Sequence, residues 1–221
     1  MNKALLVLLS VFLLAILVFF FFSANKKTNS DRSVGNGSKK VSQTKNQVNQ
    51  TKQLSTTNQA EPITSLRGPR LWLEPSKGDF KVGSIFDVKI LIDSDGKTVA
   101  GAGISSLNYD PKKLEIQDAD KTMEGIQIRK GDVFDMVMIN KVDSAAGKIK
   151  FSSLTKLGQE NYIASGNLAT ITFKVLEASP DEQLIFDFKP GLTTDCNIIS
   201  FSDSKDILQV VGNATIKLLP N

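Results

Sequence analysis

Residues 166–175, Gly-Asn-Leu-Ala-Thr-Ile-Thr-Phe-Lys-Val, decide the fold class of this chain. In an extended backbone the apolar positions fall on one side: Ala169, Ile171, Phe173 and Val175. Threonine and lysine fill the positions between them. This period of two, in β-branched and aromatic residues, predicts a strand with one buried face and one face in solvent.

The chain from Arg70 onwards contains further short segments of this kind, separated by turn-forming residues. Strands are expected at residues 71–73, 85–93, 104–109, 114–116, 134–142, 147–155, 168–175, 184–188, 207–211 and 215–219. A short helix is the alternative for residues 133–138. Asp93 to Gly96 predicts a turn, because Asp, Ser and Gly favour tight reversals. Many short strands without a sustained helical period indicate an all-β sandwich over residues 70–221.

Ahead of this domain, Ala4 to Phe22 forms an apolar run broken only by Ser10. As a helix it spans roughly 28 Å, close to the hydrocarbon thickness of a bilayer. The run ends in Phe19–Phe22, where a signal-peptide cleavage site needs small residues. We therefore expect an uncleaved transmembrane anchor over residues 1–23, with a removed signal peptide as the alternative. Lysines after the span favour a cytoplasmic C-terminal part by the positive-inside rule.

Residues 24–69 predict a disordered polar linker. Up to Leu66 this segment has no aromatic residue, and its Ser, Thr, Asn, Gln and Lys cannot bury enough apolar surface to offset ordering. The net charge of +4 belongs to the N-terminal part: residues before Gly68 carry +7, and the remainder carries −3. The basic charge is therefore that of a tail, and we expect no nucleic-acid partner.

The residue types needed for most catalytic and metal sites are scarce. The chain has no histidine, which removes Ser–His and Cys–His pairs and the commonest metal ligand. The single cysteine, Cys196, is interpreted as a buried structural thiol. Carboxylates gather in turn-like stretches at Glu115, Asp118, Asp120, Glu124, Asp132 and Asp135. A glycosidase needs two of them across a cleft, whereas solvated turns explain all of them. We expect no enzyme, no catalytic residue, no cofactor and no metal.

Three segments together resemble the cohesin domain. They are Ser106–Ile116, with tyrosine before Asp-Pro and a Leu-Glu pair after it, Gly147–Ser153, and Gly166–Val175. Residues 73–76 and 81–88 also fit the first turn and second strand of that family. The resemblance covers residues 70–219 in order and spacing.

The resemblance implies a nine-stranded jelly-roll β-sandwich that binds dockerin modules on one sheet, through its strands 3, 5 and 6. Alternation from Leu107 and Tyr109 as inward residues carries the implied binding face onto these positions: Ile104, Ser106, Asn108, Asn140, Lys150, Ser152 and Leu154. Gly103 and Ser105 depart from the family, which has larger apolar residues at these inward positions. Either the core is repacked there or the strand is bulged.

The functional expectation is a membrane-tethered, surface-displayed protein-binding module for a dockerin-like partner, linked to polysaccharide breakdown. Its localisation is the cell membrane, single-pass, with the C-terminal domain outside. The alternative is a carbohydrate-binding module of the same fold. Trp72, Tyr109 and Tyr162 are then the candidates for stacking on sugar rings. Tyr109 is expected in the core, and Trp72 is expected to pack in the core or at an edge, with sugar contact as the alternative.

Overall fold

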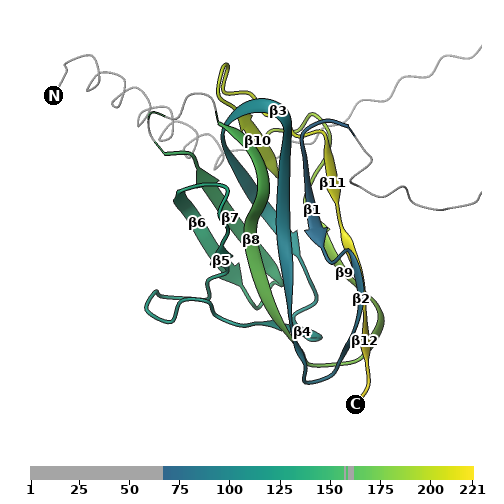
Figure 1. The fold of residues 1–221 in the computed structure, drawn as a ribbon. Coiled ribbons are helices and arrows are strands. Elements are labelled where there is room, and N and C mark those ends of the chain that lie inside the picture. The colour runs from purple at the N-terminus through teal and green to yellow at the C-terminus, as the bar shows by residue number, and fades with distance from the viewer. Residues whose placement is uncertain (1–66, 157, 159–161) are drawn as a thin grey trace, which may run out of the picture. The chain divides into compact units, whose positions relative to one another are not determined.

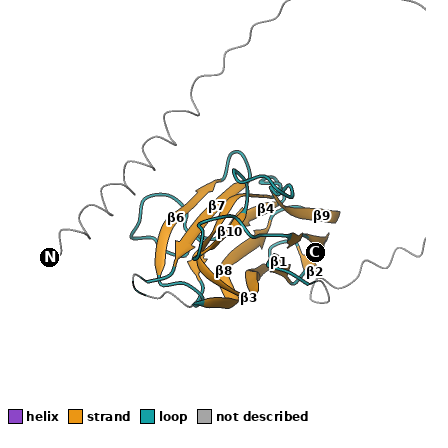
Figure 2. Cartoon of the chain, turned by 90° about the horizontal axis from the view of Figure 1, so that it is seen from above, coloured by secondary structure: helices purple, strands orange, loops and turns teal. Residues whose placement is uncertain are grey.

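The computed structural model describes residues 67–156, 158 and 162–221, and these residues contain strands and loops without a helix (Figures 1 and 2). The predicted anchor and nearly all of the predicted linker lie outside the described residues. Within the described residues no helix is long and apolar enough to cross a membrane. The twelve strands are β1 (Arg70–Glu74), β2 (Lys77–Lys81), β3 (Ile85–Asn108), β4 (Leu114–Ile116), β5 (Arg129–Lys130), β6 (Met136–Asp143), β7 (Lys148–Leu154), β8 (Ile163–Val175), β9 (Ser179–Phe186), β10 (Asn197–Ser200), β11 (Val210–Gly212) and β12 (Ala214–Leu219).

The first sheet is built around the stretch that decides the fold class. β8 pairs antiparallel with the first half of β3, with Phe173 opposite Phe86 and Ile171 opposite Val88. β1 and then β11 continue the sheet beyond β3. β4 and β5 pair with the other edge of β8. Buried residues alternate with more exposed ones along β3 and β8, as a sheet with one covered face requires.

The second sheet contains the other half of β3. β7 pairs with one edge of residues 101–108, and β6 forms the border beyond β7. On the other edge of β3 lie β10 and the end of β9, followed by β12 and β2. The apolar faces of the two sheets meet in one core of buried residues. Phe173 of β8 is fully buried in this core, with its ring 5.5 Å from that of Tyr109.

β3 is one strand that serves both sheets, which differs from the prediction of two strands separated by a turn. Asp95 and Gly96 have positive φ angles of 52° and 73°, and the carboxylate of Asp93 accepts the amide of Asp95 at 2.8 Å. This is the turn chemistry that the sequence indicates. It makes a corner, beyond which β3 pairs with β8 once more, Thr98 opposite Ile163, and then joins β7 from Gly101. The chain therefore continues forward where a hairpin would reverse it.

The other differences between predicted and observed strands mainly concern short segments that are extended because they pair with a neighbouring strand, and that show no alternation of apolar and polar residues. The short strands β2, β5 and β10 were not predicted, and they exist because β12, β8 and β3 present edges to them. Counting such short ladders gives twelve strands, compared with the nine implied by the resemblance. Residues 133–138 do not form the alternative helix, since β6 begins at Met136. Tyr109 and Cys196 are buried, as predicted.

Candidate functional site

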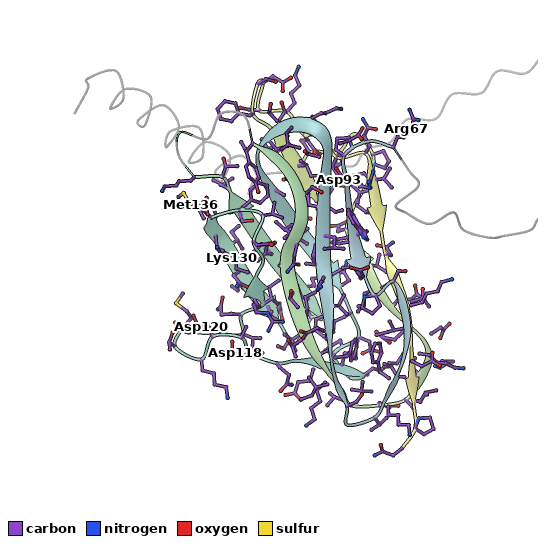
Figure 3. The ribbon with its side chains drawn as sticks, viewed as in Figure 1. Arg67, Asp93, Asp118, Asp120, Lys130 and Met136 are labelled. Carbon is purple, nitrogen blue, oxygen red and sulfur yellow. The ribbon has the colours of Figure 1, made fainter. Side chains whose placement is uncertain are left out.

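The outer face of the second sheet is the surface to which the predicted binding residues belong. The strand registers arrange it in four rows across β10 or β9, β3, β7 and β6. The rows are Ile199–Gly101–Leu154–Met136, then Asn197–Gly103–Ser152–Ile139, then Lys150–Lys141, and then Ile185–Asn108–Lys148–Asp143. We call these residues the four-row face. Figure 3 shows Met136 at the border of the sheet, where β6 begins.

Two of the predicted binding residues on β3 are buried. Ile104 is only 2% exposed and belongs to the core, and Ser106 is 8% exposed. The cause is a bulge: the register between β3 and β7 shifts between Ile104 and Leu107. An extra residue there reverses the alternation, so Ile104, before the bulge, faces the opposite way from the prediction, while Ser106 lies within the bulge itself.

The same bulge explains the glycines of β3. Gly103 is not an inward residue, because it lies opposite Ser152 and Asn197 on the four-row face. Gly101 is buried beneath its neighbour: a Cβ atom there would meet the side chain of Leu154 at 2.4 Å. Because Gly101 and Gly103 carry no side chains, the face is shallow along this part of β3, and the Leu154 side chain lies over Gly101.

Asn140 is also misplaced by the prediction, since it points between the sheets. Its amide oxygen accepts the Ile128 amide at 3.0 Å, and its amide nitrogen donates to the Ile128 carbonyl at 2.7 Å. Asn140 lies opposite Phe151, which is a core residue. The side chain thus joins β6 to the segment entering β5, and β5 belongs to the first sheet.

The remaining predicted residues do lie on the four-row face. Lys150 is exposed, while Asn108, Ser152 and Leu154 are half-buried. The side-chain oxygen of Asn108 accepts the Ser106 hydroxyl at 2.9 Å, and its amide donates to the Ile185 carbonyl at 3.3 Å. These bonds hold Asn108 in place beside β9.

The sequence prediction did not include the exposed apolar side chains of β6. Met136, Val137, Met138 and Ile139 are all between 38% and 58% exposed. A second bulge, between Val137 and Ile139, breaks the alternation that sequence reasoning follows. The available signal was the run Met-Val-Met-Ile itself, which is apolar at every position in a short segment.

A groove of about 910 Å³ lies beside β6, along the loop that precedes β5. It is lined by apolar and charged side chains, including Met123, Ile126, Val137, Met138 and Lys141. Asn140 also lines it, through the side chain that bonds to Ile128. The apolar surface of β6 therefore continues from the four-row face around the border of the sheet.

Two of the clustered carboxylates, Asp118 and Asp120, cap turns. The Asp118 carboxylate accepts the amides of Asp120 at 3.1 Å and Gln127 at 3.0 Å, and Asp120 accepts the hydroxyl and amide of Thr122. The bonds from Thr122 hold the pKa of Asp120 below its ordinary value. Figure 3 shows both aspartates on a projecting loop. No group of side chains able to hold a metal ion occurs among the described residues.

The candidate aromatics do not form a shared platform. Trp72 is half-buried on β1, and the Arg70 guanidinium lies 5.6 Å from its ring centre. Tyr109 is in the core, where burial raises its pKa. The Tyr162 hydroxyl donates to the Val133 carbonyl, and burial raises its pKa as well. Among the described residues these three rings therefore have separate structural surroundings.

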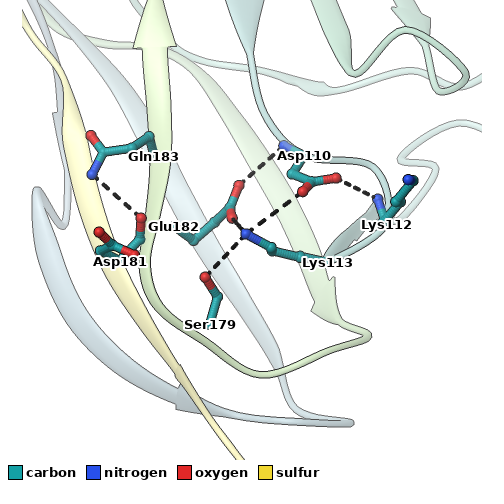
Figure 4. Close-up of polar contacts among 7 residues, drawn as sticks. All are labelled: Asp110, Lys112, Lys113, Ser179, Asp181, Glu182 and Gln183. Carbon is teal, nitrogen blue, oxygen red and sulfur yellow. Dashed lines mark hydrogen bonds and ion pairs between the residues drawn. The ribbon is translucent and has the colours of Figure 1, made fainter.

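The Tyr-Asp-Pro segment, one of the segments of the resemblance, is held by a buried carboxylate (Figure 4). Glu182 of β9 is 3% exposed, accepts the Asp110 amide at 3.1 Å and lies 3.2 Å from the Lys113 ammonium. The hydrogen bond and the charge of Glu182 raise the pKa of Lys113. This cluster fixes the end of β3 against β9, next to the last row of the four-row face.

The fold is that of a β-sandwich module whose second sheet carries the four-row face on its outer side. Comparison with family models matches residues 73–198 to the cohesin domain. The chain belongs to the cohesin family. A search of curated proteins finds no match.

Solved cohesin structures share the fold. A type I cohesin–dockerin complex from Clostridium thermocellum matches at 17% identity and a TM-score of 0.53, over 73% of this chain and 100% of that one. A type II cohesin domain from the cellulosome of Acetivibrio cellulolyticus matches at 17% identity and 0.53, over 67% and 94%. The seventh ScaB type I cohesin of Pseudobacteroides cellulosolvens matches at 19% identity and 0.51, over 71% and 95%.

Proposed function

We propose that residues 70–221 form a cohesin module that binds a dockerin-type protein on the four-row face. The observation that carries this proposal is the exposure of four successive large apolar side chains on β6: Met136 and Ile139 belong to the face, and Val137 and Met138 line the adjoining groove. Contiguous exposed apolar surface marks interaction sites on soluble domains. Methionine side chains adapt their shape to a partner. Similar folds from Clostridium thermocellum and Acetivibrio cellulolyticus are described in complex with dockerins, which supports this class of partner.

A protein partner fits the face better than a polysaccharide does. The face combines apolar, lysine and neutral polar side chains, a mixture usual for protein interfaces. Stacking on sugars needs exposed rings, and the four-row face contains none. We therefore place the module in the cohesin function and not in carbohydrate binding.

We propose in addition that Ala4–Phe22 anchors the module in the cell membrane, with the domain outside and serving a polysaccharide-degrading assembly. The length and apolar character of Ala4–Phe22 support the anchor. Full-length protein is expected to stay with membranes after carbonate washing, and protease added to intact cells is expected to release the domain. Recovery in the soluble fraction would contradict the anchor, and protection from protease would contradict the external location.

The binding function is tested with the full-length chain and a panel of purified dockerin modules, by titration calorimetry. Ile139→Asp places a charge in the second row of the face and is expected to weaken binding by about 2 kcal/mol or more. Ile85→Asp is the matched control, because Ile85 is 61% exposed and Ile139 49%, and Ile85 lies on the first sheet. An equal loss in both variants would refute the location, and absence of binding to every dockerin would refute the function.

A further inference from the structure

Two lysines face each other in the third row of the four-row face. Lys141 of β6 and Lys150 of β7 are direct partners in the antiparallel register, and both are exposed. Directly opposed residues have Cβ atoms about 4.5–5.5 Å apart, and like charges in this arrangement are destabilising. A negative charge on a partner can relieve the repulsion between these two lysines.

The described part of the chain supplies no acid to this pair. Its ion pairs join other groups, and neither lysine takes part in them. Within the four-row face the acid is Asp143, which lies opposite Lys148 in the next row. Its carboxylate already accepts the Ala146 amide at 3.0 Å in the turn between β6 and β7.

On the side away from Lys148 and Asp143, the neighbours of the pair on the face are uncharged. Ile139 and Ser152 occupy the row on one side, and the bulge at residues 105–106, which are serines, lies beside β7. Ile139 and Lys141 are two residues apart on one strand, which places them about 7 Å from each other. An apolar contact and a positive contact therefore lie side by side at a fixed spacing.

We propose that the partner places a carboxylate between Lys141 and Lys150 and an apolar side chain against Ile139. One face of a helix supplies this spacing when an acidic and an apolar residue stand three or four positions apart. The inference rests on the proposed function, since it specifies the chemistry of the protein that docks on the same face. Opposite charge in this position selects the partner and speeds association more than it adds affinity.

The experiment is a selection with a displayed library, built on the dockerin of the Clostridium thermocellum complex with its surface positions randomised. Immobilised full-length chain is used in three forms: unchanged, Lys141→Glu with Lys150→Glu, and Lys89→Glu with Lys217→Glu. The last form is the charge-matched control, because Lys89 and Lys217 are exposed and lie outside the four-row face. The melting temperature of each form is recorded, and Lys141→Gln with Lys150→Gln replaces the reversed form if that form does not fold.

Binders of the unchanged chain and of the control are expected to be enriched in Asp or Glu, three or four positions from an apolar residue. Binders of the reversed form are expected to be enriched in Lys or Arg, and those of the glutamine form to lose the acidic preference. A binder of the unchanged chain is expected to lose on the order of tenfold in affinity for the reversed form, and less at high salt. The same enrichment against all forms would overturn this inference and leave the proposed function standing. Failure to obtain any binder would overturn the proposed function.

Discussion

Replacing Asn140 by alanine removes the side chain that joins β6 to the segment entering β5. The loss includes two hydrogen bonds to the Ile128 backbone, at 3.0 and 2.7 Å. A typical bond of this kind contributes about 0.5–1.5 kcal/mol, and a buried group left without a partner costs about 1–3 kcal/mol. Ile128 is 2% exposed and lines the adjacent groove, so water can reach its backbone once the Asn140 side chain is removed. We therefore expect the free energy of unfolding to fall by about 2–3 kcal/mol.

The assay is equilibrium unfolding of the full-length chain in urea, followed by the fluorescence of Trp72. Asn140→Asp separates the two bonds: the introduced carboxylate still accepts from the Ile128 amide, but it can donate to the carbonyl only when protonated. Its deficit relative to the unchanged chain is expected to shrink as the pH falls. Lys141→Ala, at the next residue with its side chain on the other face, is the control and is expected to change stability by less than about 0.5 kcal/mol. A loss below about 0.5 kcal/mol in Asn140→Ala would refute the role of this side chain in joining the sheets.

Three further outcomes are expected. Phe173→Ala is expected to lower the free energy of unfolding by about 3–5 kcal/mol, because the ring is fully buried; a loss under about 1 kcal/mol would show that β8 faces the other way. Burial raises the pKa of the Cys196 thiol, so a disulfide reagent at pH 8 is expected to label it only after denaturation, and fast labelling of the native chain would contradict its burial. Glu182 raises the pKa of Lys113, so the stabilisation is complete below the ordinary lysine pKa of about 10.4 and is lost as the pH rises through the higher folded value. Lys113→Met is expected to abolish that alkaline loss in unfolding experiments between pH 9 and about 12, and an unchanged alkaline loss would contradict the assignment.

The fold class could be predicted because burial on one face imposes a period of two on the sequence. β8 shows this directly, from Ala169 to Val175. Strands that form only by pairing with the edge of a neighbouring strand show no such period in the sequence. β5, for example, consists of two exposed residues, Arg129 and Lys130, that pair with β8. The corner of β3 was recognised as a turn, but its local chemistry does not distinguish a reversal from a change of sheet.

The side of the sheet on which residues lie was predicted correctly for β7 and less well for the strands beside it. Lys150, Ser152 and Leu154 follow an unbroken alternation, so their side of the sheet could be derived. β3 and β6 each carry a bulge, and one extra residue reverses every assignment on one side of it. In the sequence Gly101-Ala102-Gly103-Ile104 the larger residues, Ala102 and Ile104, are the ones that face inward. This pattern indicates the correct side for each residue, but nothing in it predicts the bulge that follows.

The shared strand β3 also determines how the domain transmits force. The chain enters the sandwich at Arg70, and β1 is held between β3 and β11. A pull between Arg70 and a ligand on β7 would pass through the backbone of β3, whose halves carry the β1 and β7 ladders. The two sheets then share the load through a covalent strand, and the packed side chains between them are not pulled apart.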